Sequence, residues 1–169
     1  MESLTAFVAT ADLSSLEAFT RAHSAPALTL RFPDPEARAP DLSATADEDG
    51  MAALLGDPKQ RTHLAFLVKS ERNPFGTLIS VGRSPQNDIC LTHPSISKIH
   101  ATFARVGNTW KVSDRTATHG LFVDHLELPP GESAELEDGT LLGFGTNVEA
   151  TFHTPAGLFD YLRWLQARG

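Results

Sequence analysis

The sequence has only one cysteine, Cys90, among its 169 residues. A single thiol excludes an internal disulfide and a cysteine-rich zinc site. Cys90 stands in the apolar run 89–91, where we expect a small buried residue of a strand. His93, His119 and His125 lack the close spacing typical of zinc ligands, so the sequence indicates no metal site and no cofactor.

Long apolar runs and an excess of positive charge are also missing. No run approaches the roughly 20 apolar residues that a membrane-spanning helix needs, and the start, Met1-Glu2-Ser3, lacks the pattern of a signal peptide. We therefore expect a cytoplasmic protein that does not bind membranes. A net charge of -7 argues against nucleic-acid binding. Residues 1–60 hold 10 acidic and 4 basic residues, against 11 and 10 in residues 61–169, so a local basic pocket is expected only in the second part.

Residues 1–58 are predicted to be an N-terminal region of unknown fold. The run Ser14-Ser15-Leu16-Glu17 fits a capping box that opens a short helix, and Ala27 to Phe32 is a candidate strand. From residue 33 to 50 the composition shifts to Pro, Ala, Asp and Glu, which is typical of a linker. We place the boundary near residue 58, after the short apolar piece 51–55.

Residues 59–153 show the pattern of an antiparallel β-sandwich, because short apolar runs alternate with Gly, Pro, Asn and Asp. The run 148–152 alternates cleanly, with Val148, Ala150 and Phe152 on one face. The sequence therefore predicts a mainly β fold with a partly helical N-terminal extension. The expected strands are Leu64–Val68, Leu78–Val81, Ile89–Leu91, Ala101–Val106, Trp110–Ser113, Leu121–Val123, Leu141–Phe144 and Val148–Phe152.

Residues 154–169 are predicted to form a C-terminal helix. Thr154 is suited to the N-cap and Pro155 to the first turn. An apolar stripe at helical spacing should pack on the sandwich or on the N-terminal region. It consists of Leu158, Tyr161, Leu162 and Leu165.

Three polar clusters stand at the ends of expected strands: 82–84, 97–100 and 118–120. Strand-end loops of a sandwich gather at one edge. The clusters supply a guanidinium, two hydroxyls and an ammonium, which suit a phosphate dianion. The chain has no Gly-rich phosphate loop followed by Lys-Ser or Lys-Thr, so the phosphate should not belong to a nucleotide.

These motifs resemble the signature of the forkhead-associated (FHA) domain in order and spacing. The resemblance spans roughly residues 63–153. It is carried by Gly82-Arg83-Ser84-Pro85-Gln86-Asn87-Asp88-Ile89, Ile96-Ser97-Lys98-Ile99-His100-Ala101, Trp110-Lys111-Val112-Ser113-Asp114, Gly120-Leu121-Phe122-Val123 and Leu136-Glu137-Asp138-Gly139-Thr140-Leu141-Leu142-Gly143-Phe144-Gly145.

The resemblance implies an FHA-like β-sandwich of about eleven strands that binds phosphothreonine peptides and mediates protein–protein interaction in Ser/Thr kinase signalling. By position, Arg83 and Ser97 would contact the phosphate, Lys98 would add charge, and Thr118 and His119 would contact the peptide. Structural support of these loops would come from Gly82, His100 and Gly120. The partner would be a phosphothreonine-containing protein, such as a Ser/Thr kinase or its substrate.

Two positions depart from the family pattern. His119 replaces the usual asparagine, and an imidazole ring presents its donor and acceptor on opposite sides, unlike an amide. Leu121 replaces the usual threonine. The alternative is therefore a degenerate FHA scaffold that binds a partner or self-associates independently of phosphate.

Two further hypotheses concern chemistry and regulation. Ser97, His100 and Asp114 suggest a hydrolase triad, but no nucleophile elbow or oxyanion-hole motif accompanies them, so we expect no catalytic residue and no enzyme. Thr45 precedes an acidic run in the linker, where a kinase would reach it. Phosphorylated Thr45 would then be a ligand for the same site on its own or another chain.

Overall fold

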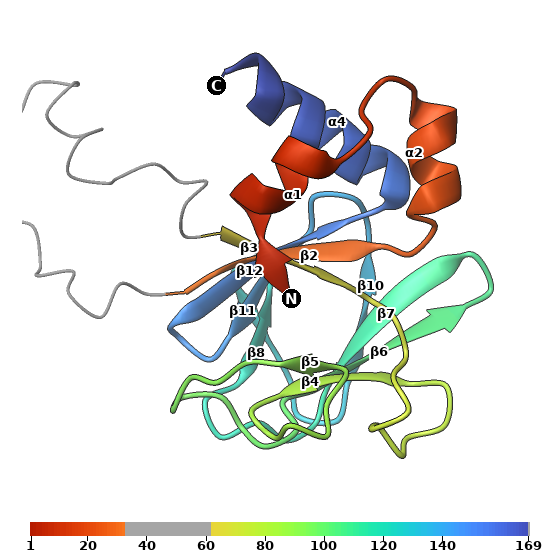
Figure 1. Cartoon of the computed structure of the whole chain (residues 1–169). Helices are drawn as coiled ribbons and strands as arrows, with labels where there is room; N and C mark the ends of the chain where they lie inside the picture. The colour runs from red at the N-terminus through yellow and green to blue at the C-terminus, as the bar shows by residue number, and fades with distance from the viewer. Residues whose placement is uncertain (33–61, 169) are drawn as a thin grey trace, which may run out of the picture.

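The computed structural model describes residues 1–32 and 62–168 as two packed β-sheets with helices at one end (Figure 1). The seven-stranded sheet has the order β1-β3-β2-β12-β11-β8-β9, and the five-stranded sheet has the order β10-β7-β6-β4-β5. The elements in chain order are β1 (Glu2–Ser3), α1 (Leu4–Thr10), α2 (Leu16–Ala22), β2 (Ala27–Arg31), β3 (Thr62–Phe66), β4 (Ile79–Gly82), β5 (Ile89–Cys90), β6 (Ala101–Val106), β7 (Thr109–Asp114), β8 (Leu121–Val123), β9 (Leu126–Leu128), β10 (Ser133–Leu136), β11 (Leu141–Phe144), β12 (Val148–His153) and α4 (Pro155–Ala167).

The main core lies between the two sheets, and the predicted mainly β sandwich with a C-terminal helix is confirmed. Phe103 of β6 and Phe144 of β11 are fully buried there. On β12 the alternation is as expected, since Val148, Ala150 and Phe152 are buried while Glu149 is exposed. Among the described residues the sandwich has twelve strands, against the expected eleven or so.

The N-terminal region contributes to the same sheet as the sandwich. Strand β2 lies between β3 and β12, with Leu28 opposite Ala65 and Phe152. Strand β1 extends that sheet by pairing with β3. The linker 33–50, Thr45, the piece 51–55 and the boundary near residue 58 all lie outside the described residues. Sheet pairing nevertheless joins residues 27–31 to the sandwich, so the region expected to have an unknown fold supplies a central strand.

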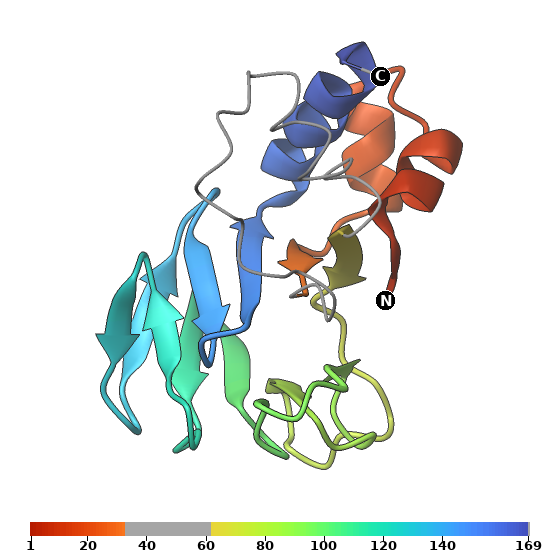
Figure 2. The same cartoon turned by 90° about the vertical axis from the view of Figure 1, so that its left-hand side faces the viewer.

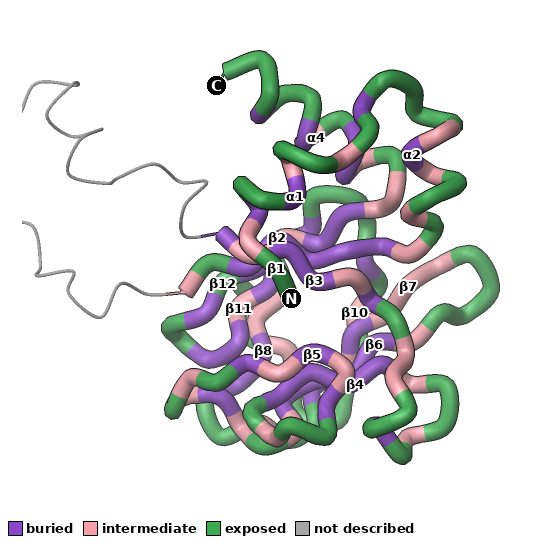
Figure 3. The backbone as a smooth tube through the Cα atoms, in the orientation of Figure 1, coloured by how far each residue is buried: buried purple, intermediate pink, exposed green. Residues whose placement is uncertain are grey.

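A second apolar core joins the helices to the sheet, and the helices lie together at one end of the sandwich (Figure 2). Phe19 of α2 is 1% exposed, and its ring centroid lies 5.5 Å from that of Phe159 on α4. Leu158, Leu162 and Leu165 of α4 are buried in this cluster. The outward sides of these helices are exposed (Figure 3). The expected packing of the C-terminal helix on the N-terminal region is therefore confirmed.

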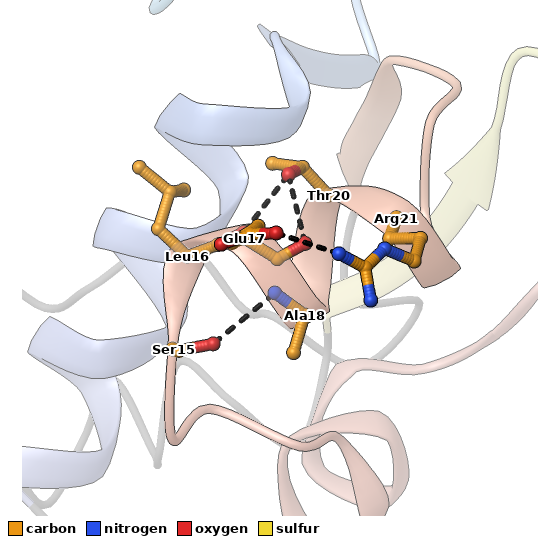
Figure 4. Close-up of polar contacts among 6 residues, drawn as sticks. All are labelled: Ser15, Leu16, Glu17, Ala18, Thr20 and Arg21. Carbon is orange, nitrogen blue, oxygen red and sulfur yellow. Dashed lines mark hydrogen bonds and ion pairs between the residues drawn. The ribbon is translucent and has the colours of Figure 1, made fainter.

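Of the two helix N-caps predicted from the sequence, one is confirmed and one is wrong. Thr154 caps α4 as expected, since its Oγ1 accepts from the amide of Gly157 at 3.1 Å. The capping box at Ser14 is wrong: Ser15 is the N-cap and accepts from the amide of Ala18 (Figure 4). Ser14 instead donates its amide to Asp12 in a local turn. Glu17 pairs with Arg21 one helical turn later, at 2.6 Å.

Three short strands, β1, β9 and β10, carry no clear sequence signal. Strand β9 follows a two-residue turn in which Asp124 and His125 have φ values of 47° and 70°. Such a turn favours Asn-Gly or Asp-Gly, and His125 conceals it in the sequence. The expected strand 64–68 is shifted, because β3 already begins at Thr62 and Val68 is 56% exposed. No helix among the described residues is long and apolar enough to cross a membrane.

The second core predicts a stability effect for α2. Replacing Phe19 by Ala should lower the free energy of unfolding by about 3–5 kcal/mol, because a buried aromatic ring is lost. Leu16→Ala is the matched control on the same helix, since Leu16 is 44% exposed, and it should change stability by less than about 0.5 kcal/mol. Denaturant unfolding measures both. Equal effects would contradict packing of residues 1–32 on the sandwich.

Candidate functional site

Three loops leave neighbouring strand ends at the edge of the sandwich away from the helices (Figure 1). In the five-stranded sheet, Ala101 at the start of β6 is opposite both Val81 near the end of β4 and Asp114 at the end of β7. The loops 83–88, 91–100 and 115–120 therefore begin or end side by side. They contain every residue that the sequence predicts for the phosphate site.

The first two loops are bonded directly to each other. The amide of Arg83 donates to the carbonyl of Ser97 at 2.9 Å, and Ser84 donates to Lys98 at 3.1 Å. Arg83 Nε also donates to the carbonyl of Ile96 at 3.0 Å. This bond holds the exposed guanidinium beside the loop that carries Ser97 and Lys98, with the charged groups of Arg83 and Lys98 toward solvent.

Asn87 locks these two loops from inside the protein. It is 2% exposed, and its Nδ2 donates to the carbonyls of Ser84 at 2.8 Å and Lys98 at 2.7 Å. Gly82 lies in the same tight packing, because an added Cβ would come within 2.9 Å of Asn87 Nδ2 and of the Cα of Ile99. Only glycine fits there without a shift of the loops.

His100 connects the second loop to the third. The ring is fully buried; Nδ1 accepts from the amide of Ser97 at 3.2 Å, and Nε2 donates to the carbonyl of Gly120 at 2.8 Å. Burial lowers the pKa of His100, and it outweighs the opposing effects of the Gly120 carbonyl and of Asp114. The ring is therefore neutral, and both nitrogens are engaged with backbone groups. Neither is directed at the hydroxyl of Ser97, as a hydrolase triad would require.

Asp114 shapes the third loop. Its carboxylate accepts from the amides of Thr116 at 3.0 Å and Ala117 at 3.2 Å. Thr116 has a φ of 60° and Gly120 a φ of 78°, so both stand in the left-handed region. The turn ends with the amide of Gly120 donating to Ala117. Asp114 is thus a structural residue of the turn.

Ser97 lies where the loops meet. Its Oγ accepts from the amide of Thr118 at 3.0 Å, so the hydroxyl hydrogen is left to donate to a ligand. Thr118 and His119 are exposed on the third loop. The structure thus brings Arg83, Ser97 and Lys98 together with Thr118 and His119, on loops fixed from behind.

Sequence reasoning missed three supporting residues and misplaced one. Asn87, Asp88 and Asp114 stand within the quoted motifs, but the sequence assigns no supporting role to any of them. Burial alone would raise the pKa of Asp88, but hydrogen bonds from Ser70, Ser80 and Asn73 outweigh it and lower the pKa. Those bonds tie β4 to the preceding loop. Cys90 is partly exposed rather than buried, and its Sγ donates to the carbonyl of Arg83 at 3.4 Å.

The fold is a β-sandwich with three bonded strand-end loops at one edge. Residues 79–145 match the family model of the FHA domain, so the chain carries an FHA domain. The FHA domain-containing protein PS1 of Arabidopsis thaliana is 37% identical over 80 residues, which cover 46% of this chain and 5% of that protein. The chain thus spans only a small fraction of this relative.

The comparison with solved structures supports the sandwich fold through a solved FHA domain. An FHA domain of an Arabidopsis thaliana hypothetical protein has a TM-score of 0.50 at 20% identity, covering 77% of this chain and 86% of that chain. Mycobacterium tuberculosis EmbR, solved in complex with a low affinity phosphopeptide, is 26% identical with a TM-score of 0.42, covering 46% of this chain and 20% of that chain.

The buried neutral His100 predicts acid sensitivity. Its pKa in the folded protein is below 6.5, so the unfolded state binds the proton first as the pH falls. The free energy of unfolding should therefore decrease below about pH 6.5, until the pH reaches the pKa of the folded state. His100→Asn, which does not titrate, should flatten this slope. Phe103→Leu, a core substitution, is a control that lowers stability but keeps the slope; equal slopes in all three proteins would contradict the account.

Proposed function

We propose that this FHA domain binds phosphothreonine-containing segments of partner proteins. The observation that carries the proposal is the junction at Ser97, where a free hydroxyl hydrogen, the Arg83 guanidinium and the Lys98 ammonium lie on loops bonded to one another. A phosphate dianion accepts such bonds from several directions, and Arg forms bidentate pairs with it. The FHA match over residues 79–145 supports the same function.

Rigidity of the loops supports recognition of a phosphorylated residue. His100, Asn87 and Asp114 bond mainly to backbone groups, so the loop shape is set before a ligand arrives. Loops held in advance lose less conformational entropy on binding. Arg83 bonds to the loop through its Nε, so its other guanidinium N–H groups and the Lys98 ammonium are available for the phosphate.

The partner is proposed to be a protein phosphorylated by a Ser/Thr kinase, or that kinase itself. The role is non-catalytic, because His100 is bonded on both ring nitrogens and Asp114 is bonded to the turn 116–117. Binding would couple phosphorylation of the partner to its association with this chain.

Titration of phosphothreonine peptides tests the proposal. Arg83→Ala should weaken binding of a phosphopeptide pool by at least about tenfold, since charge-assisted bonds contribute about 1.5–3 kcal/mol. Arg105→Ala is a matched control: Arg105 is also exposed and its Nε donates to the carbonyl of Gly107, but it lies on β6 away from the loops. It should leave the affinity unchanged.

The degenerate-scaffold alternative gives the opposite outcome. Equal binding of phosphorylated and unphosphorylated peptides, or a complex that survives both phosphatase treatment and Arg83→Ala, would contradict phosphate recognition and favour a phosphate-independent scaffold.

His119 predicts a gain of affinity on substitution. An asparagine offers a donor and an acceptor side by side for a peptide backbone, whereas neutral imidazole offers one of each on opposite sides. His119→Asn should strengthen phosphopeptide binding by roughly two- to tenfold, the effect of one added hydrogen bond. Isothermal titration of wild type, His119→Asn and His119→Ala measures this. If the His119→Asn variant binds the peptide no better than the His119→Ala variant, residue 119 makes no contact with the peptide backbone.

A further inference from the structure

A groove of about 610 Å³ lies on the outer face of the seven-stranded sheet. The helices cover one end of this face, where Ala27 and Leu64 are buried in the second core. The other end is not covered by any described helix. Its floor is formed by outward-facing residues of β2, β12, β11 and β8, and one side is bordered by Tyr161 of α4.

Phe122 and Leu141 give the groove floor an apolar part. In the sheet register Gly143 lies directly between Phe122 and Glu149. The Phe122 side chain lies over Gly143, where an added Cβ would come within 3.2 Å of the Cβ of Phe122. Leu141 is 41% exposed, so its apolar side chain is accessible from the groove.

The groove adjoins the candidate phosphate site at Gly145. Gly145 lines the groove, and a Cβ added to it would come within 3.2 Å of the Cβ of His119. Its amide donates to the carbonyl of Gly120 at 2.9 Å. The third loop of the phosphate site therefore lies next to the end of the groove at Gly145.

We propose that the groove binds a second, apolar part of the same phosphorylated partner segment. The inference rests on the proposed phosphothreonine function. The phosphothreonine would lie at Ser97 and Arg83, and the peptide would continue past His119 and Gly145 onto the sheet. There an apolar or aromatic side chain would pack against Phe122 and Leu141.

The strand geometry sets the spacing of the two determinants. From Gly145 to Leu141 the strand advances roughly 13 Å, at about 3.3 Å per residue. An extended peptide advances at the same rate, so the apolar residue would lie roughly four to eight positions from the phosphothreonine. The groove would thus add sequence preference that the phosphate contacts alone do not supply.

The test uses a library of phosphothreonine peptides with ten randomised positions on each side of the phosphothreonine. The full chain should enrich apolar or aromatic residues four to eight positions away on one side. A peptide selected in this way should bind about tenfold more tightly than its truncation to the five residues around the phosphothreonine, an increment typical of one buried apolar side chain.

Substitutions in the groove separate this surface from the phosphate site. Leu141→Glu and Leu141→Lys should both lower the affinity of the long peptide to that of the truncated one, without changing the truncated one. Leu126→Glu is the matched control, because Leu126 is 75% exposed on β9 and does not line the groove. Thermal unfolding shows whether each variant is folded.

The outcomes distinguish failure of this inference from failure of the proposed function. Equal affinity of long and truncated phosphopeptides, or equal effects of Leu141→Glu and Leu126→Glu, would overturn the groove proposal while phosphate recognition stands. A further variant replaces residues 33–61 by a Gly/Ser chain of equal length. If this variant binds the long peptide more tightly, and Leu141→Glu does not change that binding, the groove proposal is overturned and the groove is assigned to the chain itself. Loss of all phosphate dependence would refute the proposed function.

Discussion

The candidate site depends on the two hydrogen bonds of the buried His100 ring. One reaches the amide of Ser97 and the other the carbonyl of Gly120, two segments that meet only because β6, β7 and β8 converge at one edge. A buried polar ring with both nitrogens satisfied fixes the distance between the loops. Loss of the ring would take the bond partner from the Ser97 amide, whereas the Gly120 carbonyl would keep its bond from the amide of Gly145. An unsatisfied buried backbone group costs about 1–3 kcal/mol.

Two other buried side chains also hold the loops through hydrogen bonds to backbone groups. Asn87 joins the first loop to the second, and Asp114 closes the third loop on itself. All three side chains are buried and bond mainly to backbone groups, while the groups suited to a ligand point outward. Because buried residues hold the loops in shape, Arg83, Lys98 and the Ser97 hydroxyl remain available to bind a phosphate.

Local sequence signals predicted most of the strands, but they did not predict which distant strands pair with one another. The strands β6, β8 and β11 have the bounds that the apolar runs indicate, because each run is flanked by turn residues. The place of β2 was not predictable, since Leu28 finds its partners at Ala65 and Phe152, far along the chain. The motif around residues 83–100 predicted that Arg83, Ser97 and Lys98 would lie together on neighbouring loops. It did not reveal Asn87 and Asp88 as supports, because their partners are mainly backbone groups that only the folded loops bring near.

The central claim is that phosphate is recognised where the three loops meet. Amide chemical shifts measured by NMR during titration with a phosphothreonine peptide test it most directly. The account predicts shifts confined to residues 83–84, 96–98 and 117–120, with further shifts along the sheet for a long peptide, and none with the dephosphorylated peptide. Shifts centred on the helices, or the same shifts without phosphate, would contradict it.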